Sequence, residues 1–145
     1  MAIYHRIVRK TKVSSKELRA MIEQDIVEVF REVGEETVER LRETAPVYTG
    51  SLRASIYMAT GGQSTYAQAA SDARLLNSRA IITPGHSTQS RLTLVIGSAV
   101  LHSLFVEHGT VAAPAYPFFA PQMEWLRSEL NTRLRDRRKN RGLRR

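Results

Sequence analysis

The stretch SSKELRAMIEQDIVEVFREVGEETVERLRETAP, residues 14–46, predicts one long amphipathic helix. Ser14 and Glu17 match the S-x-x-E pattern of a capping box, in which each side chain satisfies an exposed amide at the helix start. Apolar side chains then recur at helical spacing, at Leu18, Ile22, Ile26, Val29 and Val33. Pro46 disfavours helical geometry in the residue before it, so the helix should end there.

The length of this helix also bears on how the molecule is used. Roughly 28 residues at 1.5 Å each give a rod of about 42 Å. The whole chain has 145 residues, which is room for one domain, and such a domain cannot cover this rod completely. We therefore expect residues 1–134 to form a single domain in which part of the helix contacts a neighbouring molecule.

Beyond Gly50 the sequence changes to the shorter period of strands. Alternating side chains predict strands, the first of them loosely patterned, at 3–10, 52–58, 79–83 and 91–97. The small, polar stretch 61–71 predicts a loop, and helical spacing returns at 101–108 and after Pro121. Helices grouped at both ends of the strands predict an α+β fold. We expect the long N-terminal helix and the C-terminal helix to pack on a small antiparallel sheet of three to four strands.

Composition excludes several classes of protein. The chain has no cysteine, which removes disulfide scaffolds, thiolate metal sites and cysteine catalysis. No apolar run approaches the roughly 20 residues of a bilayer span. Residues 1–10 lack the apolar core of a signal peptide, so we expect a soluble protein without membrane contact.

The net charge of +8 is concentrated at the two ends of the chain. Residues 126–145 hold nine basic and two acidic side chains, whereas residues 21–50 hold three basic and eight acidic ones. The last eleven residues predict a flexible basic tail, 135–145, which is either an arm for phosphate or an acidic protein surface, or a solubilising helix end. Its candidate contact residues are Arg135, Arg137, Arg138, Lys139 and Arg141.

Residues with catalytic or metal-binding potential are scattered. His102 and His108 are six residues apart, on different faces of a helix, which does not match a zinc helix. No nucleophile, base and orienting group come together in the sequence, and we expect no catalytic residue, metal or cofactor. Glu107 is the one acid in a long stretch, and we expect it to form a structural pair with Arg53 across the sheet.

Three stretches of unusual local geometry carry a resemblance to a known family. They are A-P-x-x-T-G-x-L-R-x-S-I from Ala45, V-E-x-G-T from Val106 and P-x-x-P-F-x-x-P from Pro114. In this order they resemble the tail-completion or neck (head–tail joining) family of long non-contractile-tailed bacteriophages. The matching residues are Pro46, Thr49, Gly50, Leu52, Arg53, Ile56, Glu107, Gly109, Thr110, Pro114, Pro117, Phe118 and Pro121. The resemblance implies that they serve turn geometry, core packing and contacts between subunits. Ala120, where many relatives are basic, and the long 61–90 region depart from the pattern.

The resemblance implies a structural virion protein and not an enzyme. Such a protein forms a ring at the phage neck, joins the head connector to the tail tube and lets DNA pass. The implied partners are further copies in a six- or twelve-fold ring, a head-completion or connector protein, and a tail terminator or tail-tube protein. The protein would assemble in the host cytoplasm and remain in the virion.

Three features of the residues themselves also favour an assembly protein. The long helix exceeds what one domain covers, the polar loops have no apolar cover of their own, and the charged ends need a partner. The alternative function is a small basic DNA-binding protein that uses its arginine-rich C-terminal tail, with a salt-sensitive affinity.

Overall fold

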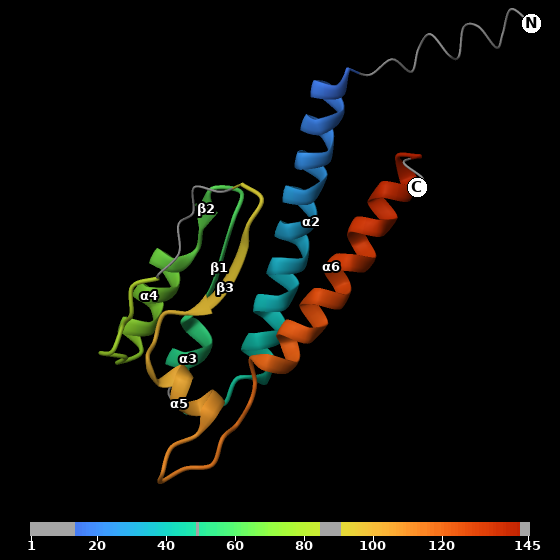
Figure 1. Cartoon of the computed structure of the whole chain (residues 1–145). Coiled ribbons are helices and arrows are strands. Elements are labelled where there is room, and N and C mark those ends of the chain that lie inside the picture. The colour runs from blue at the N-terminus through green and yellow to red at the C-terminus, as the bar shows by residue number, and fades with distance from the viewer. Residues whose placement is uncertain (1–13, 49, 85–90, 143–145) are drawn as a thin grey trace, which may run out of the picture.

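The computed structural model describes residues 14–48, 50–84 and 91–142 and is drawn in Figure 1. Its elements follow in the order α2 (Ser15–Thr44), α3 (Ser51–Ala54), β1 (Ile56–Thr60), β2 (Gln63–Ser64), α4 (Tyr66–Leu75), β3 (Leu94–Ser98), α5 (His102–His108) and α6 (Ala120–Asn140). The fold is α+β, as predicted, with long helices at both ends of the chain and a three-stranded antiparallel sheet between them. The candidate strand 3–10 lies outside the described residues.

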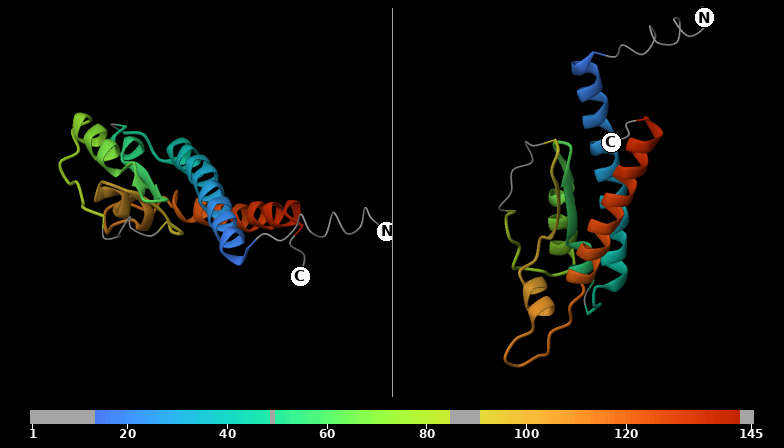
Figure 2. Two further views of the ribbon diagram at one scale, coloured as in Figure 1. Left: turned by 90° about the horizontal axis from the view of Figure 1, so that it is seen from above. Right: turned by 45° about the vertical axis from the view of Figure 1, so that its right-hand side comes forward.

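The elements form layers, which Figure 2 shows from above. The sheet has the order β2-β1-β3, and β1 pairs antiparallel with both neighbours. α2 packs on one face of the sheet, where Met58 and Leu94 touch Gly34 of the helix. α4 covers the other face, where Tyr57 meets the ring of Tyr66 edge-on. α6 runs along α2, so it joins the sheet layer through α2.

α2 begins and ends where the sequence predicts. The Ser14 side chain accepts from the Glu17 backbone amide at 3.2 Å, and the Glu17 carboxylate accepts from the Ser14 amide at 3.0 Å, which completes the capping box. The helix ends at Thr44, before Pro46. Gly34 lies in its buried middle, where an added Cβ would come within 3.0 Å of the Leu94 and Met58 side chains. Glycine therefore allows the sheet to approach the helix closely.

The predicted strand 52–58 is wrong in its first half. Residues Ser51–Ala54 form the short helix α3, and the strand begins only at Ile56. Gly50 precedes the helix with φ +81°, a left-handed conformation that reverses the chain. The Ser55 hydroxyl bonds to the Leu52 carbonyl at 2.7 Å and so closes the turn. The alternation of apolar and polar residues that predicted one strand belongs here to a helical turn followed by a fully buried strand.

The predicted loop 61–71 is also wrong, because most of it is secondary structure. Residues 63–64 form β2, and α4 begins at Tyr66. Its inner face consists of the small residues Ala69, Ala70 and Ala73, all buried. Alanine has the best helix propensity and needs little space against a sheet, so the small side chains that suggested a loop belong to a closely packed helix.

The predicted strand 79–83 is reduced to a single bridge. Ile81 pairs with Val100, and the Ile82 amide donates to the Ala99 carbonyl at 2.9 Å. The predicted strand 91–97 exists as β3, from Leu94 to Ser98, and the predicted helix 101–108 exists as α5.

The domain boundary predicted at residue 134 falls inside a helix. α6 continues to Asn140, so the first residues of the predicted flexible tail are helical. Its half-buried leucines, Leu126, Leu130 and Leu134, recur every four residues along the helix. The reason for the extra length is electrostatic, because arginines of the predicted tail pair with acids of α2.

Candidate functional site

The carboxylate of Glu107 holds the start of α6 in place. Its Oε2 accepts the amides of Phe118 at 2.9 Å and Phe119 at 2.8 Å, and its Oε1 accepts the amide of Ala120 at 2.9 Å. No side chain of the α6 N-terminus provides a cap itself. Burial alone would raise the pKa of Glu107, but the three backbone donors outweigh burial and hold its pKa below the usual range.

The predicted pair of Glu107 with Arg53 is wrong, although both residues are structural. Arg53 Nε donates to the Ala45 carbonyl at 3.1 Å, and its Nη2 donates to the Glu43 carbonyl at 3.4 Å. These carbonyls lie at the C-terminus of α2, where helical partners run out and a guanidinium is favoured. Each charged group therefore caps a different helix end.

Between α5 and α6 the chain forms a tightly closed loop. Gly109 has φ +78°, and an added Cβ would lie 2.7 Å from the Ala115 nitrogen, so the loop requires glycine there. The Thr110 amide donates to the Ala113 carbonyl at 2.8 Å, and the Thr110 hydroxyl accepts the Ala113 amide at 3.1 Å. The Tyr116 amide returns to the Val106 carbonyl at 2.7 Å. The backbone is thus fixed by local hydrogen bonds.

The side chains on this loop face solvent although most are apolar. Residues 111–116, Val-Ala-Ala-Pro-Ala-Tyr, are all exposed, and we call them the apolar loop. Val111 is fully exposed and Tyr116 is 58% exposed. The adjacent α5 adds Leu104 and Phe105, each about half exposed. Figure 1 places α5 and this loop at the end of the molecule farthest from the start of α2. A fixed, exposed apolar loop is suited to binding another protein surface.

The structure brings the three sequence motifs together at this end. Leu52 and Ile56 of the first motif share one buried cluster with Phe118 of the third. Val106, at the start of the second motif, packs against the same cluster. Thr49 lies outside the described residues. Pro114, Pro117 and Pro121 are exposed and shape the chain between the apolar loop and α6.

A cavity of about 570 Å³ lies beside these motifs. Pro46, Gly50 and Leu52 line it on one side, and His102 and Val106 line it on the other. Burial lowers the pKa of His102, which favours the neutral imidazole. Among the described residues no group of three or more histidine or acidic side chains is placed to hold a metal.

The candidate contact residues of the basic tail fall into two sets. Arg137 bonds to Glu28 and Glu32 of α2, both at 3.0 Å, and Arg141 binds both oxygens of Asp25. Arg135, Arg138 and Lys139 are exposed. Hydrogen bonding to Arg141 is the main cause that holds the pKa of Asp25 below its usual range.

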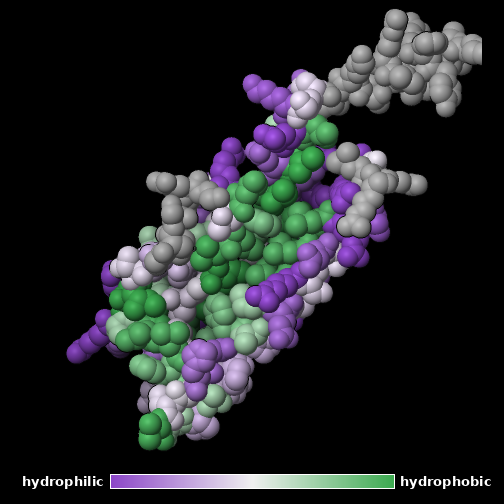
Figure 3. Space-filling view, viewed as in Figure 1, coloured by the Kyte–Doolittle hydropathy of each residue, from purple (hydrophilic) through white to green (hydrophobic). Residues whose placement is uncertain are grey.

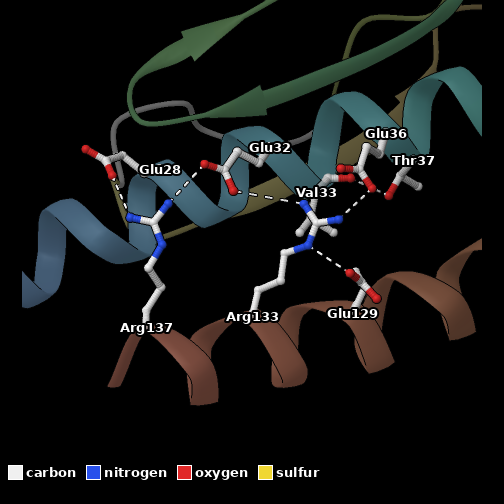
Figure 4. A network of polar contacts seen from close by, with 8 residues as sticks. All are labelled: Glu28, Glu32, Val33, Glu36, Thr37, Glu129, Arg133 and Arg137. Atoms are coloured by element: carbon white, nitrogen blue, oxygen red, sulfur yellow. Dashed lines mark hydrogen bonds and ion pairs between the residues drawn. The ribbon is translucent and has the colours of Figure 1, made fainter. Parts of the chain in front are cut away.

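Arg133, Arg137 and Arg141 form a continuous series with acids of α2, which we call the arginine ladder. Figure 4 shows two of its rungs, where Arg133 reaches Glu36 at 2.7 Å and Arg137 bridges Glu28 and Glu32. The arginines recur every four residues, which matches acids spaced along one face of α2. That matching spacing was the sequence signal for the ladder, and the prediction of a mobile tail overlooked it.

Comparison with family models, curated proteins and solved structures finds no match to this chain. Among the described residues, no helix is both long and apolar enough to cross a membrane.

Proposed function

We propose that this protein is a structural component of a phage neck, a ring-forming subunit that joins the head connector to the tail tube and lets DNA pass. The observation that carries the proposal is the apolar loop. Its side chains face solvent, while its backbone is held by Gly109, Thr110 and the Glu107 anchor. Presenting apolar side chains from a fixed backbone reduces the entropy lost on association.

The motif resemblance supports the same proposal. The residues that carry it are distant in sequence, yet they converge on the base of the apolar loop and its buried support. The motif residues act as a scaffold: the Glu107 carboxylate accepts three backbone amides, the Arg53 guanidinium donates to two carbonyls, and the Phe118 ring is buried. In a cyclic ring, one heterologous contact repeated around an axis would cover such a loop in every subunit.

A second apolar surface adds to this support. Figure 3 shows apolar side chains gathered along the seam between the sheet and the two long helices, bordered by polar side chains. Ile22 is 37% exposed on α2, and Leu94 and Ile96 of β3 are only half-buried. Contiguous apolar surface with a polar border is typical of protein–protein contacts. The molecule therefore offers apolar surface both on its side and at its end.

The alternative, a DNA-binding protein that reads phosphate with its basic tail, has less support. Arg137 and Arg141 already form ion pairs within the molecule, with Asp25, Glu28 and Glu32. Arg135 and Lys139 take no part in the arginine ladder, and they are the side chains through which DNA binding would act. Loss of salt-sensitive duplex binding in an Arg135→Ala/Lys139→Ala variant would favour this alternative.

The proposal is tested by imaging the purified full-length chain, alone and mixed with connector and tail-terminator proteins of its own virus, by negative-stain electron microscopy. We expect rings with a central channel, six- or twelve-fold, or a ring recruited onto one of these partners. Single particles that bind none of the partners at any concentration would contradict the proposal.

A further inference from the structure

We propose that the N-terminal arm, residues 1–13, of one copy binds in a groove between α2 and α4 of a second copy. The inference rests on the proposed ring-forming function and names one of the contacts that would link its subunits.

The groove lies on the side of α2 that faces α4. It has a cavity of about 1040 Å³, with Val38, Met58 and Ala69 contributing apolar side chains. A second cavity of about 520 Å³ shares Glu35 and Met58 with the first and continues along the sheet. The two together form an open channel with an apolar lining, large enough for a short segment of chain.

Charged side chains of both signs border this groove, and its four acids stand beside Arg31, Arg40 and Arg42. Glu35 and Glu39 come from α2, and Asp72 comes from α4 on the other side. Glu39 pairs with Arg42 at 3.4 Å, and Asp72 accepts a hydrogen bond from Gln68 Nε2 at 2.7 Å, whereas Glu35 forms no ion pair with the described residues. Glu35 on the α2 wall and the second carboxylate oxygen of Asp72 on the α4 wall therefore remain available to a basic ligand.

A buried hydroxyl in the same groove also lacks a partner. Thr60 is only 6% exposed and lines the second cavity, and its Oγ1 has no hydrogen-bond partner among the described residues. Buried polar atoms in folded proteins are nearly always paired, so such a hydroxyl points to a ligand that supplies a donor or acceptor. A peptide backbone offers both.

The arm has the complementary chemistry. Its thirteen residues include Arg6, Arg9, Lys10 and Lys12 and no acidic side chain. Between these charges stand Ile3, Ile7 and Val8, which suit the apolar lining. A basic segment with interspersed apolar residues suits a groove that is apolar inside and has more acids than arginines at its edges.

Distance keeps the basic residues nearest α2 away from this groove in their own chain, although the first residues of a fully extended arm, about 45 Å long, could reach it. Glu35 is 21 residues along α2 from Ser14, which is about 31 Å at 1.5 Å per residue. Lys10 is four residues before Ser14 and can lie only about 14 Å from it even when the chain is fully extended. Arg9, Lys10 and Lys12 therefore fall short of the groove in their own chain, while the arm of a neighbouring copy has no such limit.

The absence of cysteine allows a direct test by disulfide crosslinking. Full-length Val8→Cys is mixed with full-length Gln68→Cys of distinguishable mass, because Gln68 is exposed on the α4 wall of the groove. The matched control partner is Ser128→Cys, which is exposed on α6 outside the groove lining. We expect disulfide-linked dimers with Gln68→Cys and about tenfold fewer with the control, because a disulfide needs close approach of the two residues.

Charge reversal tests the recognition chemistry in the same assay. Adding Glu35→Lys and Asp72→Lys to the Gln68→Cys chain should reduce the crosslink about tenfold at low salt, and adding Arg9→Glu and Lys10→Glu to the Val8→Cys chain should restore it. Equal crosslinking at both cysteine positions, insensitivity to the charge changes, or a disulfide formed only within one chain that carries both cysteines would overturn the inference.

The mass of the same samples, measured by light scattering, separates this inference from the proposed function. Oligomers that form without the Val8–Gln68 crosslink would refute the arm contact and leave the ring proposal standing. A chain that remains monomeric, forms no crosslink and binds neither the connector nor the tail-terminator protein would refute both.

Discussion

The two halves of α6 are attached to the rest of the molecule by different physical means. Its first turn is held by the Glu107 carboxylate and by the buried Phe118 ring just before it. Its second half is held by the arginine ladder, whose side chains are about one third exposed. Buried packing and backbone hydrogen bonds change little with salt, whereas exposed ion pairs weaken as salt rises. The half near the apolar loop is therefore the rigid half.

Among the substitutions that test this contrast, Phe118→Ala should lower the free energy of unfolding most. Phe118 is 2% exposed and joins the core of α2, α3 and β1 to the start of α6. Its removal leaves a cavity, and we expect the free energy of unfolding to fall by about 4 kcal/mol, measured by urea denaturation.

The matched control for Phe118→Ala is Phe105→Ala on α5. Phe105 is 52% exposed, and we expect its removal to cost less than about 1 kcal/mol. Equal losses of unfolding free energy in the two variants would mean that burial of Phe118 does not stabilise the end of the molecule near the apolar loop.

Glu107→Gln should have the next largest effect. An amide side chain cannot replace a carboxylate on three backbone donors, and we expect a loss of about 2 kcal/mol at neutral pH. Because folding lowers the pKa of Glu107, its contribution is present above the unfolded-state pKa and disappears as the pH falls through the folded-state value. The difference between the two proteins should therefore shrink below about pH 4.5.

Glu23→Gln is the control for this charge change, since Glu23 is exposed on the first turns of α2. It should leave the free energy of unfolding within about 0.5 kcal/mol of the parent. A pH-independent loss in Glu107→Gln would show that the carboxylate contributes through shape and not through its charge.

Arg137→Ala should have the smallest effect and the clearest salt dependence. Its ion pairs with Glu28 and Glu32 are partly exposed, so we expect a loss below about 1 kcal/mol that diminishes as sodium chloride is raised to 1 M. The salt series is measured by thermal or urea denaturation of both proteins. A loss that is large and insensitive to salt would place the ladder among the rigid contacts and remove the contrast between the two halves.

The sequence predicts an element well where the residues at its two ends themselves set where it begins and stops. The Ser14–Glu17 capping box and Pro46 delimit α2 locally, so its span could be predicted closely. Ala69 and Ala70 could not be assigned in the same way, because small side chains indicate a helix only when the sheet that they cover is known.

The candidate site, like the fold, could be predicted from the sequence only in part. The importance of Glu107 was visible from its isolation among uncharged residues, but its partners were not. They are backbone amides at Phe118, Phe119 and Ala120, which leave no mark on side-chain patterns. The arginine ladder was in principle visible from spacing, but recognising it required knowing that α6 lies along α2.

The central claim is that the apolar loop is a contact between subunits. Its most direct test is the molar mass of full-length protein, measured by light scattering over a concentration series, for the parent and for Val111→Asp. The control is Leu75→Asp, which changes an apolar residue that is 79% exposed at the end of α4. We predict an oligomer for the parent and for the control, and a lower molar mass at each concentration, with unchanged stability, for Val111→Asp. An oligomer that is unaffected by Val111→Asp would contradict the claim.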